Sequence, residues 1–244
     1  AASDVYKRQY VATVLPGASA ALIRDTEFGG DAFVGLQVQS HTHNPGRDLA
    51  FALNWVKNNE PGATLESTAA DGSEPKLEEL IDASATLDVQ VHQDFEWWIP
   101  EGAQVTPQIA QSLRAANDSV IESHQVGENI TGAAFWANAG GGKAHIRWVR
   151  PSDDEAAFLN ALARVAARGE LNLGEGTKFA GVFRTHGLIA PVFDLDPEVD
   201  HASYEEHLTR VDKALEEEIS NDAQLNADER KQLENIKSRQ VTLR

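Results

Sequence analysis

The sequence of 244 residues contains neither cysteine nor methionine. The absence of cysteine excludes disulfide bonds and thiolate metal sites from this chain. The segment DVYKRQ at residues 4–9 matches the in-frame translation of a transposase sequencing adapter. We therefore interpret residues 1–9 as an artefact of sequence assembly, to be excluded from fold reasoning, and expect the natural N-terminus to be missing.

Positive charge and long apolar runs are also scarce. The 38 acidic residues outnumber the 21 lysines and arginines, which gives a formal charge of −17. A nucleic-acid surface needs a local excess of positive charge, so we expect no nucleic-acid partner. No apolar run approaches the roughly 18 residues that a membrane-spanning helix needs, so we expect no membrane insertion.

The most regular stretch of the chain is residues 173–195. Two apolar runs, 178–184 and 188–194, flank a short turn that contains glycine. This arrangement predicts a β-hairpin. Because both faces of each run are mostly apolar, the two strands are expected in the middle of a covered sheet. We expect this hairpin to form the centre of the core.

Alternating and helical patterns continue along the rest of the chain. They predict an α+β fold, with a mixed or largely antiparallel sheet built from strand–strand–helix units and helices packed on it. We expect a single domain over residues 10–244, with a helical, acidic C-terminal segment at 200–244 whose charges face solvent. Residues 62–75 are expected to form a mobile loop. Strands are predicted at 10–15, 20–24, 32–39, 87–92, 95–99, 132–138 and 144–150, and helices at 47–57, 76–81, 106–120, 151–167, 204–219 and 227–237.

A weak internal repeat accompanies this pattern. The segment around Pro45 and Leu53 aligns with the segment around Pro151 and Leu159, and each follows a predicted hairpin. The alignment favours a repeated strand–strand–helix unit. Chance similarity is the competing interpretation.

His186 is the strongest single candidate for an acid or base, because it stands in the turn between the two central strands. Arg184 could bind an anion beside it, and Glu175 or Asp194 could contact the imidazole ring. However, the sequence contains no serine in a G-x-S-x-G pattern and no cysteine nucleophile. A hydrogen-bonded structural histidine is therefore the competing interpretation.

Two glycine-rich stretches resemble ligand loops but lack a required feature. Residues 140–143 (GGGK) have alanine where a nucleotide-binding loop needs glycine and Ser or Thr, so they predict a hairpin tip. Residues 174–177 (GEGT) could hold a phosphate through backbone N–H groups, but the acidic side chain opposes an anion and favours a simple turn.

The remaining histidines and the tryptophans are also interpreted structurally. Neither histidine pair has a further ligand at a spacing typical of metal sites, so we expect no metal and no other cofactor in this chain. The tryptophans could stack on a ligand, but core packing is their commoner use. These residues are His41 and His43, His201 and His207, and Trp97, Trp98, Trp136 and Trp148.

Several segments in a fixed order resemble one family. They are VATVLPGASAAL, VGLQVQS, RDLAFAL, HIRWVRP, LGEGTKFAGVFRTHGLIAPVFDL and the closing SRQVTLR. In this order the set resembles the actinobacterial domain of unknown function 5926, from about Tyr10 to Arg244.

The resemblance implies a cytoplasmic actinobacterial protein, and it brings neither an established activity nor functional residues. Longer members of the family begin with a cysteine-rich SEC-C zinc motif, and many carry a SecA-like preprotein translocase label. Zinc is therefore expected only in the missing N-terminal segment. The acidic segment over 194–222 departs from the family pattern.

Three functions are compatible with these features. The first is a non-catalytic binding or adaptor protein with a protein partner, since no complete catalytic set is found. The second is an enzyme that uses His186 as a base and Arg184 as an anion-binding group near the 178–194 hairpin. The third is a self-associating scaffold or regulatory subunit that uses the exposed face of the helix at 204–219.

Overall fold

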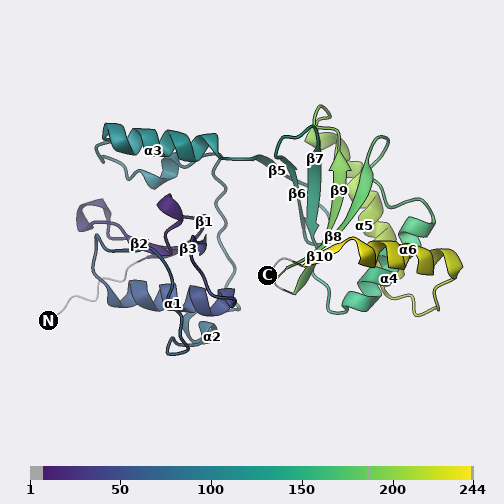
Figure 1. Ribbon diagram of the computed structural model, residues 1–244, viewed down its shortest axis with the longest axis horizontal. Coiled ribbons are helices and arrows are strands. Elements are labelled where there is room, and N and C mark those ends of the chain that lie inside the picture. Colours follow the sequence, from purple (N-terminus) through teal and green to yellow (C-terminus); the bar gives the residue numbers. More distant parts are fainter. Residues whose placement is uncertain (1–7, 186, 243–244) are drawn as a thin grey trace. The chain divides into compact units, whose positions relative to one another are not determined.

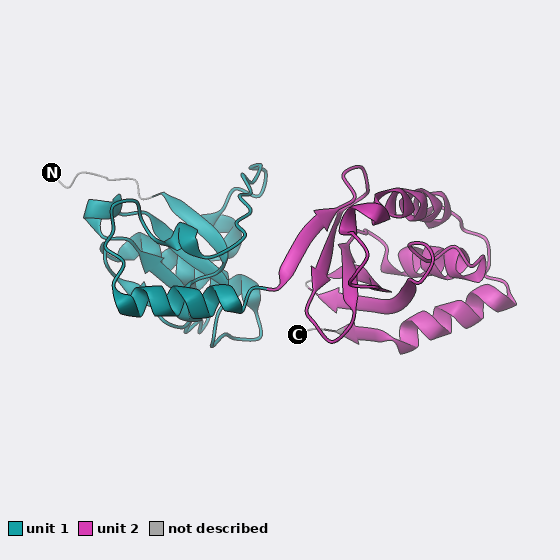
Figure 2. Cartoon of the chain, turned by 90° about the horizontal axis from the view of Figure 1, so that it is seen from above, with its two compact units in different colours: residues 1–120 teal, residues 121–244 magenta. Residues whose placement is uncertain are grey.

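The structure is a computed structural model that describes residues 8–185 and 187–242. The chain divides into two compact units, residues 1–120 and 121–244, which Figure 2 draws in teal and magenta. Each unit has its own mixed sheet with helices packed around it, which confirms the α+β class. The single domain expected over 10–244 stays a prediction.

Unit 1 contains a four-stranded sheet with the strand order β1-β3-β2-β4 (Figure 1). β1 (Gln9–Val14) runs parallel to β3 (Ala32–Gln37). β2 (Ala21–Ile23) runs antiparallel to β3 and to the short β4 (Thr64–Leu65). The three strands predicted at 10–15, 20–24 and 32–39 are confirmed.

Helix α1 (Pro45–Asn58) covers one face of this sheet. The Asn44 side chain caps the helix by accepting a hydrogen bond from the Arg47 amide, and Pro45 occupies the first helical position. Apolar residues of one helix face are buried against the apolar residues of β2 and β3. The cluster comprises Ala21, Ile23, Ala32, Val34, Ala52, Leu53 and Val56.

Aromatic side chains cover part of the other face. Trp98 packs on Phe33 with ring centroids 5.4 Å apart, and both side chains are buried. The Arg24 guanidinium lies 4.7 Å from the centroid of the Phe33 ring and donates hydrogen bonds to the Trp97 and Trp98 carbonyls. These contacts hold residues 96–98 in a 3₁₀ turn, η3 (Glu96–Trp98). The strand predicted at 95–99 is therefore wrong.

The stretch at 62–75 is ordered by polar contacts in addition to the packing of Leu65 on the apolar cluster. The buried Asp48 carboxylate accepts hydrogen bonds from the hydroxyl groups of Thr42 and Thr68. The Arg47 side chain donates to Glu74, with 2.5 Å between Nε and Oε1. The expected mobile loop thus has three points of attachment, counting the pairing of β4 with β2, and the sequence pattern does not reveal them.

Unit 1 ends with two helices. α2 (Leu77–Leu80) packs beside α1, and α3 (Pro107–Asp118) begins at the Thr106 cap. α3 buries none of its residues, and its Ile109 side chain is 41% exposed. Between these helices the predicted strand at 87–92 is wrong, because this segment pairs with no strand.

Unit 2 contains a six-stranded sheet with the strand order β10-β8-β9-β7-β6-β5. All pairs are antiparallel except β10 with β8. The strands are β5 (Glu122–Val126), β6 (Ala133–Asn138), β7 (Ala144–Val149), β8 (Lys178–Thr185), β9 (Leu188–Leu195) and β10 (Gln240–Thr242). The predicted hairpin is confirmed as β8 and β9, and β9 is an interior strand.

Three helices gather on one side of this sheet in Figures 1 and 2. They are α4 (Glu155–Ala167), α5 (Glu205–Ile219) and α6 (Ala227–Ser238). An Asn226–Glu229 capping box starts α6, as the sequence indicates. The turn η4 (His201–Tyr204) precedes α5.

The internal repeat corresponds to a hairpin followed by a helix in each unit, β2–β3–α1 and β6–β7–α4. The helix starts do not align, however. Asp154 caps α4, whereas the aligned Asp48 lies inside α1 and is buried.

Arg150, which follows β7, is completely buried in unit 2. Its guanidinium lies 5.3 Å from the Trp148 ring centroid and forms ion pairs with Asp212, at 2.9 Å, and with Glu216. Both acids belong to α5, so this face of the helix is not simply solvated as expected. The Asp212 side chain is 13% exposed and that of Glu216 is 53% exposed, so Asp212 neutralises more of the buried charge.

We predict that Asp212→Asn lowers the free energy of unfolding by about 3 kcal/mol, because it leaves the Arg150 charge buried without its principal partner. Glu216→Gln is the matched control and should cost less than about 1 kcal/mol, because its carboxylate is half exposed and screened by water. Urea unfolding followed by circular dichroism measures both values. Equal losses in the two variants would contradict the dominant role of Asp212.

The Arg47–Glu74 pair predicts a pH dependence for the 62–75 stretch. The hydrogen bond from Arg47 lowers the pKa of Glu74 from its usual 4.5 to about 2, and the Gly72 amide contributes. The stabilisation is therefore complete above pH 4.5 and is lost as the pH falls toward about 2. The amide signals of Asp71 and Gly72, which donate to this carboxylate, should report the transition by NMR.

Glu74→Gln is the control for this pH dependence. It should shift the same amide signals at neutral pH and remove the Glu74 part of their acid transition, because a neutral amide does not titrate there. The Asp71 carboxylate, whose pKa is lowered by hydrogen bonds from Ser73, remains to titrate. A Gly72 amide that titrates near the usual glutamate value in the wild-type protein would refute the interpretation.

Candidate functional site

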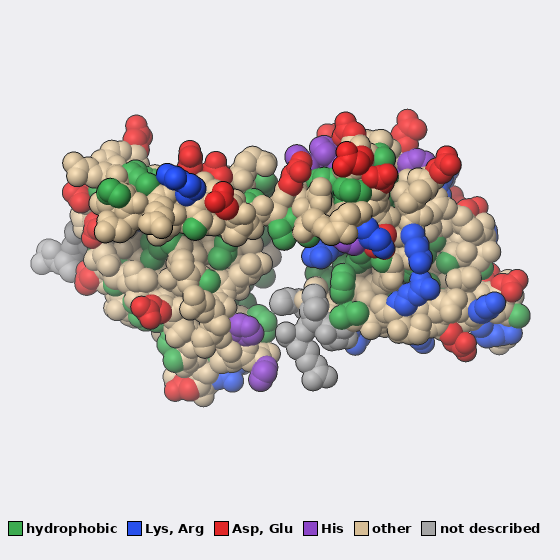
Figure 3. All heavy atoms as spheres, turned by 45° about the horizontal axis from the view of Figure 1, so that its top comes forward, with side chains coloured by type: hydrophobic (Ala, Val, Ile, Leu, Met, Phe, Trp, Pro, Cys, Tyr) green, Lys and Arg blue, Asp and Glu red, His purple; other side chains and the backbone are tan. Residues whose placement is uncertain are grey.

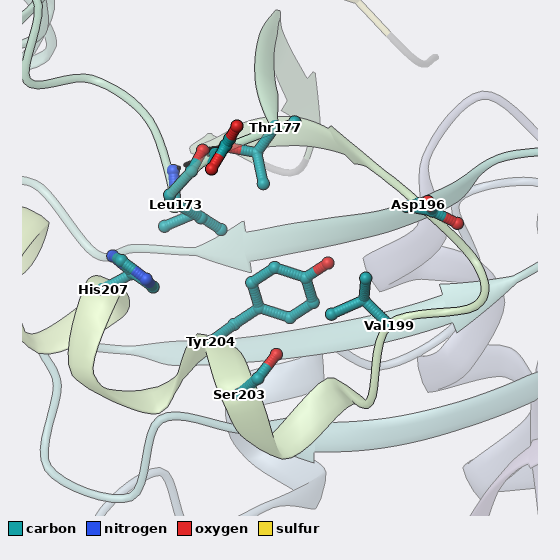
Figure 4. Close-up of a pocket in the computed structure, with 10 residues that line it drawn as sticks. Leu173, Thr177, Asp196, Val199, Ser203, Tyr204 and His207 are labelled. Atoms are coloured by element: carbon teal, nitrogen blue, oxygen red, sulfur yellow. Dashed lines mark hydrogen bonds between the residues drawn. The ribbon is translucent and has the colours of Figure 1, made fainter.

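A pocket of about 290 Å³ opens in unit 2 between the 173–177 turn and the start of α5 (Figure 4). Three segments form it: the turn before β8, the loop after β9, and the stretch from η4 into α5. Its lining combines apolar, hydroxyl, carboxylate and imidazole groups. The lining residues are Leu173, Gly174, Glu175, Gly176, Thr177, Asp196, Val199, Ser203, Tyr204 and His207.

The 173–177 turn is fixed by its own hydrogen bonds. The Thr177 hydroxyl accepts from the Leu173 amide at 2.9 Å and donates to the Gly174 carbonyl at 2.7 Å. Leu173 is buried and anchors the turn in the core. Glu175 lies at the exposed tip, where no described residue forms a hydrogen bond or ion pair with its carboxylate.

Tyr204 is the central side chain of the pocket. It is 4% exposed, and its ring crosses the pocket with the hydroxyl directed toward the side where Asp196 and Val199 lie (Figure 4). Burial raises the pKa of the Tyr204 hydroxyl, and the Asp196 carboxylate raises it further. The hydroxyl therefore stays protonated at neutral pH, and none of the described residues forms a hydrogen bond with it.

His207 closes the opposite end of the pocket against Gly174. A Cβ atom placed on Gly174 would lie 2.7 Å from His207 Nε2, and Gly174 has a φ of +104°. Glycine is therefore required here both for the backbone conformation and for the close approach of the imidazole ring.

The site that the sequence suggests around His186 stays a prediction. His186 lies outside the described residues. Arg184 forms an ion pair with Glu155, and Asp194 contacts Lys143 at 2.9 Å. Glu175 lines the pocket but precedes β8, whereas Arg184 is near the other end of that strand.

The other histidines that the sequence pairs lie in separate places. His201 stacks on His124, with ring centroids 4.0 Å apart, and His207 lies in the pocket instead. His41 and His43 belong to the loop before α1. Among residues 8–185 and 187–242, no group of three or more histidine, aspartate or glutamate side chains is placed to hold a metal ion.

The tryptophans and the GGGK stretch have structural positions. Trp97 and Trp98 pack on β3 of unit 1, whereas Trp136 and Trp148 are buried in unit 2. Residues 140–143 form the turn between β6 and β7, as predicted for a hairpin tip.

A second unusual feature is the segment at residues 87–92 of unit 1, which has no regular secondary structure and which we call the open segment. Leu87, Val89 and Val91 are 82%, 74% and 76% exposed. The backbone groups of the open segment form no hydrogen bond with any described residue. His92 anchors its end by stacking on Trp97, with ring centroids 5.0 Å apart.

The sequence alone did not identify Tyr204 or Asp196 as parts of a site. Tyr204 fits the apolar stripe of its helix, and Asp196 lies in an acidic loop, so neither residue stands out. The glycine-rich turn at 174–177 is the part of the pocket that the sequence indicates. The acidic Glu175 in this turn disfavours an anion.

We predict that Gly174→Ala lowers the free energy of unfolding by about 2 kcal/mol, because alanine is strained at positive φ and its Cβ displaces His207. Gly176→Ala is the control, since its φ is +76° but no atom lies within 4 Å of the added carbon. It should cost about 1 kcal/mol or less. Urea unfolding gives the energies, and the NMR signals of the His207 ring should shift only in Gly174→Ala.

Comparison with known proteins gives one match. The model of a family of unknown function, DUF5926, matches residues 2–244. No curated protein and no solved structure matches the chain. Within the described part of the chain, no helix has both the length and the apolar character needed to cross a membrane. Since the match extends over almost the whole sequence, the chain belongs to the DUF5926 family.

Proposed function

We propose that this protein is a non-catalytic binding module that contacts a protein partner through the open segment. In this mode residues 87–92 add as a strand to an exposed sheet edge of the partner. The observation that carries the proposal is an exposed segment with an apolar side chain at every second position, whose backbone donors and acceptors are unpaired among the described residues.

The side-chain pattern of the open segment supports strand addition. Leu87, Val89 and Val91 alternate with polar residues, so in a β conformation they share one face. Burial of each such side chain contributes about 1.5–3 kcal/mol, which is a substantial driving force for association. Backbone hydrogen bonds to the partner would supply affinity, and apolar pockets for alternate side chains would supply selectivity.

Unit 1 also presents the open segment in a defined way. The stacking of His92 on Trp97 attaches one end to the aromatic cluster on β3. The Asn117 side chain of α3 accepts a hydrogen bond from the Phe95 amide at 2.8 Å. A segment fixed at one end loses less conformational freedom on binding than a free peptide does.

The side chains that the sequence suggests for catalysis, Arg184 and Glu175, give less support to an enzymatic role. The Arg184 side chain is engaged with Glu155, which competes with an anionic substrate for its charge. Glu175 belongs to a pocket that Arg184 does not line. A binding role therefore needs fewer assumptions than an acid–base reaction.

We predict that Val89→Pro abolishes partner binding without loss of stability. Proline removes the central N–H donor of the added strand but is compatible with extended backbone in an exposed segment. The full chain would be used as bait in a lysate of an organism that encodes a family member. Hydrogen exchange on the purified complex should then show protection of the amides at 87–92.

Gln90→Ala is the matched control, because it changes the polar face and leaves every backbone donor in place. It should capture the same partner as the wild type. A partner that binds Val89→Pro equally well, or a complex without protection at 87–92, would refute the proposal. Light scattering distinguishes a foreign partner from a second copy of this chain.

A further inference from the structure

Most hydrogen-bonding groups of the unit 2 pocket are already engaged. The Thr177 hydroxyl is saturated within its own turn, and the Ser203 hydroxyl donates to the Asp200 carbonyl at 2.6 Å. One Asp196 oxygen accepts from the Glu198 amide at 2.9 Å. The oxygens left to accept a hydrogen bond from a ligand include the Glu175 carboxylate, the second Asp196 oxygen and the Tyr204 hydroxyl, and the His207 imidazole also lines the pocket.

The charges of the side chains that line the pocket determine whether it favours a cation or an anion. Glu175 and Asp196 are carboxylates, and no lysine or arginine lines the pocket. Glu198 and Asp200 are exposed on the same loop as Asp196. Figure 3 shows acidic side chains gathered along one edge of unit 2. An anion would be repelled here, whereas a cation would be attracted.

Tyr204 provides evidence that does not depend on the acidic residues. Its side chain is more than nine-tenths buried, and its hydroxyl is directed into the pocket without a partner among the described residues. The hydroxyl oxygen itself is not among the fully buried polar atoms, so it faces the open space of the pocket. It is therefore available to a ligand that enters the pocket.

We propose that this pocket binds a primary alkylammonium group. Such a group carries three N–H donors, and Glu175, Asp196 and Tyr204 each offer at least one free acceptor oxygen. The apolar surfaces of Leu173, Val199 and the Tyr204 ring would contact the alkyl chain, and the ring face also attracts a cation.

The size of the pocket restricts the ligand further. Pockets for drug-sized ligands occupy about 300–1,000 Å³, and this one has about 290 Å³, so it suits a short chain. The ammonium group can come from a free amine or from a lysine side chain, which share this chemistry. The inference is independent of the open segment, since all of its residues belong to unit 2.

Titration of the ¹⁵N-labelled full chain, followed by NMR, tests the proposal. n-Butylammonium should produce saturable shifts at the amides of 174–177 and 196–207 at millimolar concentration. 1-Butanol and butyrate have the same chain without the positive charge and should produce none. Nα-acetyl-lysine methylamide distinguishes the sources: tighter binding than n-butylammonium indicates a lysine side chain, and weaker binding indicates a free amine.

Two variants assign the interaction to its residues. Asp196→Asn should weaken binding about tenfold, because it removes a charge-assisted hydrogen bond and retains the turn. Tyr204→Phe should weaken it about threefold to tenfold, because it removes one neutral hydrogen bond and keeps the ring. Glu198→Gln is the matched control on the same loop, and its affinity should stay within about twofold of the wild type.

The outcomes are decisive in either direction. Circular dichroism confirms that each variant is folded before its affinity is compared. No saturable shift with either ammonium probe, or equal shifts with 1-butanol, would overturn the proposal. So would an Asp196→Asn affinity equal to that of Glu198→Gln. None of these results affects the binding of a protein partner by the open segment.

Discussion

The ion pair between Arg150 and Asp212 is the constraint on which the organisation of unit 2 depends. A guanidinium that is completely buried must be neutralised, and its partner comes from α5, 62 residues further along the chain. This requirement fixes the rotation of α5 about its own axis, because Asp212 has to face the end of β7. Tyr204 and His207 lie at the start of the same helix, so the geometry of the pocket follows from the position of a charge more than one helical turn away.

Regular elements with strong apolar patterns could be predicted from the sequence, whereas those formed by polar residues could not. The β8–β9 hairpin, α1 and α5 follow directly from residue periodicity. β5 was missed because its sequence, ESHQV, is polar for four of its five residues and lies at a sheet edge. Residues 87–92 have a strand pattern without a strand, since no edge within the described residues accepts them. The local sequence indicates whether a segment favours the β conformation, but not whether a neighbouring strand is available to pair with it.

The candidate site was predictable only in part, for a related reason. The 174–177 turn could be recognised from its glycines, and its own hydrogen bonds confirm that it is a turn. The rest of the pocket depends on two segments that are about 20 and 30 residues away, and neither contains a recognisable motif. Likewise, the pairing of Arg150 with α5 is invisible in a sequence where 38 acids offer many partners. The acidic partner of a buried arginine that lies far away in the sequence can be identified only from the three-dimensional structure.

The pairing of β10 with β8 also has a consequence for how the protein is made. Gly181 permits this pairing, because a Cβ at that position would lie 2.8 Å from the Arg239 carbonyl oxygen. The sheet of unit 2 cannot be completed until residue 242 has left the ribosome, whereas the sheet of unit 1 is complete in sequence by residue 65. Synthesis therefore imposes an order in which the first unit can fold while the ribosome is still translating the second. The edge of β8 stays uncovered during that interval and is the surface that nascent-chain chaperones would need to shield.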